Sequence, residues 1–203
     1  MEEIWSKACR NYEIPEEVAS KWFAIIQQRL SEDTEERRYH NWQELLLSKQ
    51  ELLRDCSPNV VLAAFFQYYA FDGKRTCVTQ NCLAFEEFCR DANFPDIETK
   101  QVILKLLGDK SSASVRCYDK EASLLQDMDL MVLGSSPEEY KRYAKLLRQE
   151  YSHMSDVDYK QMRLKVLQTL LMIPNIYTTT EFQSKYEEQA RSNIKQEIGE
   201  LKH

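Results

Sequence analysis

Glycine and proline are scarce in this sequence, which has four glycines and five prolines among 203 residues. Sheet-rich folds need many tight turns, and tight turns use these two residues. Their scarcity, together with abundant leucine, glutamate, lysine and glutamine, favours helices. The apolar fraction is 43% and the charged fraction is 30%. That balance is typical of a globular chain and excludes a disordered one.

Long apolar runs are also missing. The longest, Val60 to Phe66, has seven residues, well short of the roughly 18 that indicate a membrane-spanning helix. The stretch from Met1 to Trp5 is acidic and lacks the apolar core of a signal peptide. We therefore expect a cytoplasmic protein without a membrane association.

Positive charge is in deficit, since the formal net charge is −6. An acidic chain repels phosphate backbones, so we expect no general nucleic-acid binding. The adjacent pair Arg37 and Arg38 is a local exception. It is either a solvated pair at a helix start or part of a site for a small anion.

The six cysteines do not form a recognisable metal motif. They lie at positions 9, 56, 77, 82, 89 and 117. Cys77, Cys82 and Cys89 are close in sequence, but their spacing matches no common zinc pattern and no histidine lies near them. In a reducing compartment we expect buried free thiols.

Apolar periodicity and capping residues predict a chain of helices joined by short breaks. The expected helices cover residues 15–30, 42–55, 60–69, 82–92, 96–107, 122–132, 136–152, 156–172 and 181–201. Ser57 before Pro58 and Ser136 before Pro137 are typical helix starts. Gly134 is expected as a helix C-cap. The segment 60–69 is apolar nearly all round, so it belongs at the centre of a core. These features predict one packed helical domain.

Several short motifs follow one another along these helices. They are Arg37-Arg38-Tyr39-His40-Asn41-Trp42, Val61-Leu62-Ala63-Ala64-Phe65-Phe66, Asp127-Met128-Asp129-Leu130, Arg148-Gln149-Glu150-Tyr151, Ile176-Tyr177-Thr178-Thr179 and Glu188-Gln189-Ala190-Arg191. Their order and spacing resemble a family of predicted metal-dependent phosphohydrolases in the HD superfamily. The resemblance covers about residues 22–201. It implies a single compact, all-α, multi-helix HD-domain-like fold over residues 1–203.

The resemblance also implies a metal site. HD enzymes bind a divalent metal through a histidine, an adjacent His-Asp pair and a later aspartate, and the metal activates water for attack on a phosphate ester. His40 stands at the position of the first histidine. Asp129, with Asp127 nearby, stands at the position of the final aspartate.

The remaining ligand positions depart from the family pattern. Glu44 replaces a second histidine, and Gln67 and Tyr68 replace the His-Asp pair. The family also has a histidine before the final aspartate, but residues 105–120 contain none. Glutamine is a poor metal ligand and tyrosine an unusual one at neutral pH. We therefore expect no tightly bound cofactor; Glu44 and Asp129 leave at best a weak site for Mg²⁺ or Mn²⁺.

Two further histidines lie outside these motifs. His153 is expected on the surface, and His203 is the last residue.

Framework residues of the family persist as well, including Tyr177. Arg148 and Arg191 either belong to a buried Asp–Arg network that holds helices in register or, with Arg38 and His40, line an anion pocket. The candidate residues for binding an anion or ligand are Arg38, Arg148, Arg191 and Tyr177.

Three functions fit these observations. The first is a catalytically inactive HD-fold protein that binds a protein partner or a small phosphate-bearing ligand. The alternative is an active phosphohydrolase for a nucleotide or small phosphate ester, with Glu44, Asp127 and Asp129 as ligands and His40 as general acid. The third is an interaction scaffold that uses the aromatic residues of segment 68–71. The sequence also allows that these aromatic side chains fill the vacated metal cavity.

Overall fold

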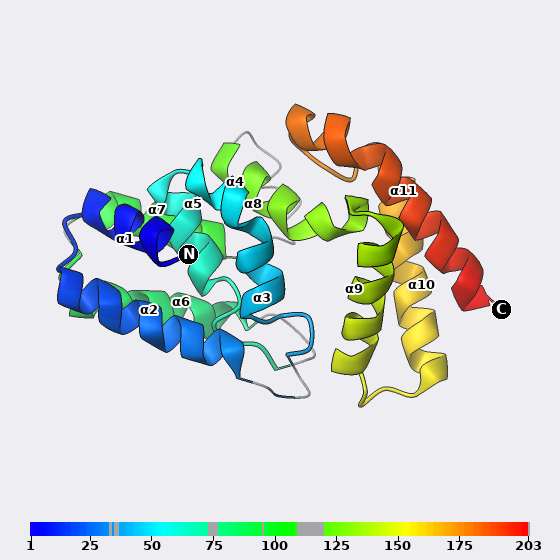
Figure 1. The fold of residues 1–203 in the computed structure, drawn as a ribbon, viewed down its shortest axis with the longest axis horizontal. Coiled ribbons are helices and arrows are strands. Elements are labelled where there is room, and N and C mark those ends of the chain that lie inside the picture. The colour runs from blue at the N-terminus through cyan, green and yellow to red at the C-terminus, as the bar shows by residue number, and fades with distance from the viewer. Residues whose placement is uncertain (33, 35–36, 73–76, 95, 109–119, 203) are drawn as a thin grey trace. The chain divides into compact units, whose positions relative to one another are not determined.

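The structure is a computed structural model, and it describes residues 1–202 apart from residues 33, 35–36, 73–76, 95 and 109–119. Within these described residues every regular element is a helix (Figure 1), which confirms the all-α prediction. The chain divides into two compact units, Met1–Leu125 and Gln126–His203. The HD-domain-like arrangement stays a prediction, as does the assignment of the whole chain to one domain.

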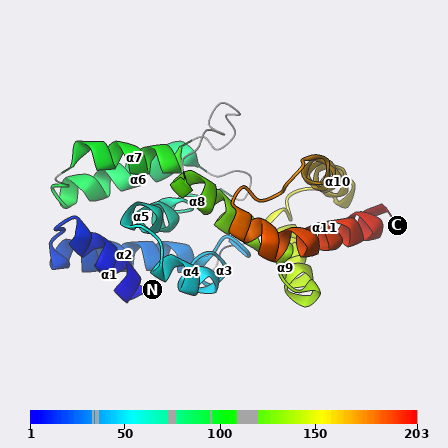
Figure 2. The ribbon, with the colours of Figure 1, turned by 90° about the horizontal axis from the view of Figure 1, so that it is seen from above.

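A central helix organises the first unit. The unit contains α1 (Glu2–Asn11), α2 (Glu16–Ser31), α3 (Trp42–Leu45), the 3-10 turn η1 (Leu47–Lys49), α4 (Gln50–Arg54), α5 (Pro58–Phe66), α6 (Val78–Asp91) and α7 (Ile97–Leu107). Figure 2 shows α5 between a layer formed by α1 and α2 and a layer formed by α6 and α7. Leu62 and Phe66 of α5 are fully buried. The apolar segment is therefore central, as its composition predicts.

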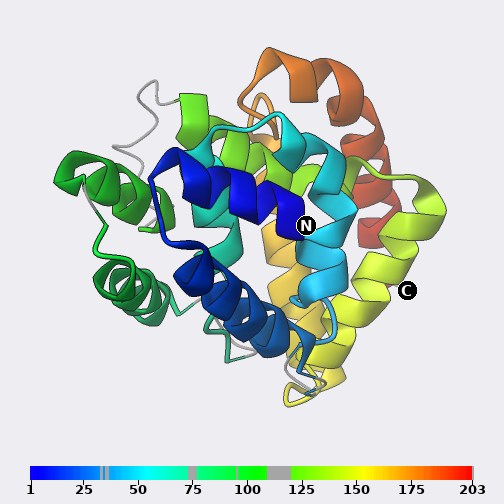
Figure 3. The same ribbon diagram turned by 60° about the vertical axis from the view of Figure 1, so that its left-hand side comes forward.

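Helix α1 was not among the predicted helices, and it runs beside α2 (Figure 3). Its inner face carries Trp5, which is fully buried. The Trp5 ring centroid lies 4.9 Å from that of Phe65 and 5.4 Å from that of Phe88. The indole nitrogen donates to the carbonyl of Ala19 at 2.8 Å. The acidic first turn, Glu2 and Glu3, was a helix signal that the sequence analysis did not use.

The single helix predicted for residues 42–55 is wrong. The segment forms α3, η1 and α4 in succession, because the backbone departs from helical angles at Leu46 (φ −109°, ψ −52°) and Lys49 (φ −106°, ψ 10°). Ser48 Oγ donates to the carbonyl of Glu44. Such side-chain bonding to the preceding turn is known to bend helices.

The second unit is built from three long helices and the end of a fourth. Helix α8 (Lys120–Leu130) begins in the first unit and ends in the second, followed by η3 (Met131–Gly134), α9 (Pro137–Glu150), α10 (Asp156–Met172) and α11 (Thr180–Lys202). In Figure 2, α11 passes between α9 and α10. Ser136 and Glu139 form a full capping box at the start of α9, which confirms the predicted start.

A buried polar cluster joins these three helices. Glu197 of α11 accepts two hydrogen bonds from Arg163 of α10, at 2.8 and 3.0 Å, and one from the hydroxyl of Tyr140 of α9. All three side chains are at least 92% buried. A bidentate, buried ion pair fixes the register of the helices that carry it.

Gly134 has a different role from the predicted C-cap. It ends η3, and its backbone is outside the left-handed region. A Cβ added there would lie 2.6 Å from Cβ of Tyr186 and 2.7 Å from its carbonyl oxygen. Glycine is therefore required because η3 lies directly against α11.

Candidate functional site

His40 lies just before α3, in the first unit. Asn41 caps that helix, since its Oδ1 accepts from the backbone nitrogen of Glu44 at 3.1 Å. The Nδ2 of Asn41 donates to the carbonyl of Arg38 at 2.8 Å. These hydrogen bonds fix the turn that holds His40, directly before α3. The His40 side chain is half-buried.

Aromatic rings surround His40. Its ring stacks on Phe71 with centroids 4.3 Å apart and an interplanar angle of 28°. The ring of Tyr68 is 4.8 Å away, and that of Tyr39 is 5.2 Å away in an edge-on arrangement. The structure thus brings together two of the predicted site residues, His40 and Tyr68, and adds Phe71.

The loop after α5 is held by two buried side chains. Arg37, 6% exposed, donates to the carbonyls of His40 (3.1 Å), Tyr68 (2.9 Å) and Tyr69 (2.8 Å). Asn81, in the first turn of α6, donates to the carbonyl of Gln67 at 2.6 Å and accepts from the nitrogen of Ala70 at 2.7 Å. Neither role was predictable, because nothing local in the sequence distinguishes a buried arginine or asparagine from an exposed one.

Gln67 is the C-cap of α5 and is only 6% exposed. Its side-chain Nε2 is enclosed by protein and has no hydrogen-bond partner. Among the buried side-chain nitrogen and oxygen atoms of the described residues, this one alone lacks a partner. An unpaired buried donor of this kind calls for a physical explanation.

The two predicted aspartates belong to the second unit. Asp127 is fully buried, and its carboxylate accepts from the nitrogen of Thr178 (2.8 Å) and from the nitrogen and hydroxyl of Thr179 (both 2.7 Å). It therefore binds the segment that leads into α11. Asp129 lies two residues on and is half-buried.

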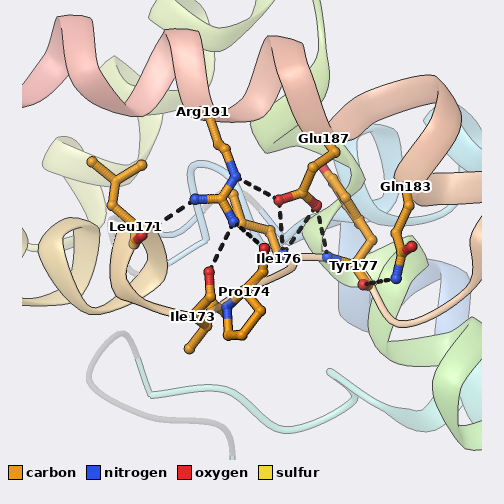
Figure 4. A network of polar contacts seen from close by, with 8 residues as sticks. All are labelled: Leu171, Ile173, Pro174, Ile176, Tyr177, Gln183, Glu187 and Arg191. Atoms are coloured by element: carbon orange, nitrogen blue, oxygen red, sulfur yellow. Dashed lines mark hydrogen bonds and ion pairs between the residues drawn. The ribbon is translucent and has the colours of Figure 1, made fainter.

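Arg191 binds main-chain oxygens of the segment that joins α10 to α11 (Figure 4). It donates to the carbonyls of Leu171 (3.2 Å), Ile173 (2.8 Å) and Pro174 (2.8 Å). It also pairs with Glu187 at 2.7 Å.

Glu187 in turn accepts from the backbone nitrogens of Ile176 and Tyr177, at 2.9 to 3.2 Å (Figure 4). Tyr177 is 1% exposed, and its hydroxyl donates to the carbonyl of Leu130 at 3.1 Å. Together Arg191 and Glu187 hold both carbonyls and N–H groups of this connecting segment.

Arg148 supports the turn between α9 and α10. Its guanidinium donates to the carbonyls of Tyr151 (2.7 Å) and Met154 (3.2 Å) and pairs with Asp156 at 2.6 Å. The guanidinium also lies 4.7 Å from the ring centroid of Tyr159. These contacts agree with a framework role for Arg148.

The predicted residues thus form two sets. The first unit holds Arg38, His40, Glu44, Gln67 and Tyr68, and the second holds Asp127, Asp129, Arg148, Tyr177 and Arg191. Convergence of the two sets on one metal or anion site stays a prediction. Within the described part of the chain, no group of three or more His, Cys, Asp or Glu side chains is placed to hold a metal ion. Of the predicted Asp–Arg network, Asp127 binds Thr178 and Thr179, Arg191 pairs with Glu187, and Arg148 pairs with Asp156, which is exposed.

The cysteines whose thiol pKa is raised are poorly suited to act as nucleophiles at neutral pH. Burial raises the pKa of Cys9 and Cys89 to about 12 and that of Cys56 to about 11. These cysteines carry thiols and not disulfides, and the thiols stay protonated at neutral pH, so they are weak nucleophiles. Cys117 and His203 lie outside the described residues. His153 is exposed, as predicted.

A groove of about 660 Å³ lies between α1 and the segment from α4 to α5. Its floor is formed by Ile4, Ala8, Leu53 and Val61, which are at most 7% exposed. Because these residues are already buried, the groove offers little apolar surface to a ligand. Its described lining contains none of the predicted site residues.

No family model matches the sequence, and the searches of curated proteins and of solved structures gave no match. None of the described helices is long and apolar enough to cross a membrane.

Proposed function

We propose that this chain is a non-catalytic relative of the HD-superfamily phosphohydrolases, and that it binds a small phosphate-bearing ligand or a protein partner through the His40 region. One observation carries the proposal: the His40 ring is stacked on Phe71 and packed against Tyr68, where the family resemblance implies metal ligands. Aromatic rings so close to the imidazole occupy space that a metal and its water need.

The aspartate side of the inferred site supports the same proposal. Both oxygens of Asp127 accept hydrogen bonds from Thr178 or Thr179. A carboxylate that already accepts three hydrogen bonds has few lone pairs left for a metal. Asp129 is the remaining acidic candidate of this unit.

Metal analysis of the purified protein tests the proposal, together with phosphatase assays of nucleotides and phosphate esters in the presence of Mg²⁺ or Mn²⁺. We expect substoichiometric Mn, Fe and Zn and no turnover above that of an Asp129→Ala variant. Stoichiometric metal that is lost in Asp129→Ala, or turnover that this substitution abolishes, would establish the enzyme instead.

A further inference from the structure

The segment from Gln67 to Ala70 has an unusually fixed backbone for a loop. The carbonyls of Gln67, Tyr68 and Tyr69 and the nitrogen of Ala70 are all bound by the side chains of Arg37 or Asn81. Both of these side chains are at least 94% buried. Rigid support of this kind is what positions a recognition side chain with the accuracy that binding requires.

Gln67 nevertheless carries the unpaired buried Nε2 described above. The hydrogen bonds from Arg37 and Asn81 hold the backbone that carries this amide. Buried polar groups in native proteins nearly always have a partner, and a missing partner costs stability. A fixed donor without a partner therefore indicates a position that an acceptor atom occupies when the protein is in its functional state.

The chemistry of the amide defines that acceptor. An amide NH₂ group donates hydrogen bonds and cannot coordinate a metal cation. Hydrogen bonds to a charged oxygen are about twice as strong as those to a neutral one. The guanidinium of Arg37 donates to the carbonyl of Tyr68, one residue along the chain.

We propose that Gln67 is the recognition residue of this region, and that its amide donates a hydrogen bond to an oxyanion oxygen, from a phosphate or a carboxylate group, of a bound ligand. This inference rests on the proposed binding function and names the residue and the ligand chemistry. It differs from a metal site at the same place, because the NH₂ group of Gln67 is a hydrogen-bond donor and cannot coordinate a metal cation.

Nuclear magnetic resonance of the full chain tests the inference. The side-chain NH₂ signals of Gln67 are assigned by their loss in Gln67→Leu, and the protein is titrated with inorganic phosphate and, separately, with acetate. We expect a saturable shift of these signals with at least one probe. A response to phosphate alone indicates a phosphoryl ligand, and a response to acetate alone indicates a carboxylate ligand.

Variants separate recognition from general ion effects. Gln67→Leu keeps the backbone carbonyl that Asn81 binds, so we expect it to fold and to bind the probe at least about tenfold more weakly, as backbone amide shifts report. Gln67→Glu, which places an acid against the oxyanion, should also lose binding. The matched control is Gln27→Leu, at an exposed position of α2, which should bind as the native protein does.

Three results would overturn the inference. They are the absence of any response to both probes, equal binding by the native protein and Gln67→Leu, and contact of the Gln67 amide with a buried water that neither probe displaces. The titration is repeated with Mn²⁺. Binding that requires Mn²⁺ and survives Gln67→Leu would overturn the non-catalytic function as well, whereas failure without such metal dependence overturns the role of Gln67 alone.

Discussion

At the scale of single residues, Asp127 shows how a carboxylate in a catalytic-looking motif can serve the fold. Its carboxylate accepts hydrogen bonds from two backbone N–H groups and one hydroxyl. The backbone N–H groups of Thr178 and Thr179 find their acceptor in this buried side chain. The motif Asp127-Met128-Asp129 therefore contains one residue with a clear structural task and one, Asp129, that stays a candidate ligand.

Replacing Asp127 should be costly. Asp127→Ala removes the charged acceptor of two backbone N–H groups and one hydroxyl, so we expect the free energy of unfolding to fall by about 1.5–3 kcal/mol. Urea denaturation measures this loss. Asp55→Ala, at an exposed position, serves as the control and should change stability by less than about 0.5 kcal/mol. Equal effects of the two substitutions would contradict the capping role of Asp127.

The glycines provide a second prediction, with an internal control. In Gly134→Ala the new methyl group would meet Cβ and the carbonyl of Tyr186 at 2.6 and 2.7 Å, so we expect a loss of about 1–3 kcal/mol. In Gly199→Ala nothing lies within 4 Å of the added Cβ, and a helical alanine should stabilise α11 by about 1 kcal/mol. Thermal unfolding should therefore shift in opposite directions, and shifts of the same sign would be inconsistent with the close approach of η3 to α11.

At the scale of elements, the polar cluster of the second unit decides how α9, α10 and α11 pack. Burial raises the pKa of the Tyr140 phenol, so its hydroxyl keeps the proton that it donates to Glu197. The same carboxylate neutralises Arg163. Three helices are thus tied to one buried group.

A double-mutant cycle tests this cluster. Glu197→Leu alone leaves the Arg163 charge buried without its acid, so we expect a loss of about 4 kcal/mol. The double variant Arg163→Met/Glu197→Leu removes both charges and should be more stable than Glu197→Leu. Urea denaturation of all four proteins gives the coupling free energy. Losses that simply add would show that the pair contributes nothing as a unit.

At the scale of the whole molecule, the buried thiols predict a dependence of stability on pH. The folded pKa values of Cys9 and Cys89, about 12, lie above the ordinary thiol value of 9.0. Folding therefore favours the protonated thiol, and this contribution is fully present below about pH 9 and is lost as the pH rises toward 12. The urea midpoint should fall between pH 8 and pH 10.5. It should fall less in Cys9→Ala/Cys89→Ala, and an identical slope would argue against buried thiols as the cause.

Local signals explain which parts of the fold were predictable. Ser57 and Ser136 cap α5 and α9 as expected, because capping depends on residues three positions apart. The apolar segment around Leu62 is central because no face of it is polar. By contrast, the break of residues 42–55 into short helices depends on Leu46 and Lys49, which are both buried by tertiary packing. No local pattern marks either of them as a break.

The sequence by itself determined that this protein is helical and where most helices start. It also predicts, through a family resemblance, that His40, Gln67 and Tyr68 stand at metal-ligand positions, and this stays a prediction. These are properties of composition, short-range capping and order along the chain. Only the tertiary structure decided that Phe71 stacks on His40, that Arg37 and Asn81 hold the loop after α5, and that the Gln67 amide is buried without a partner. Each of these depends on contacts between segments distant in sequence, and such contacts leave no periodic pattern in the residues that make them.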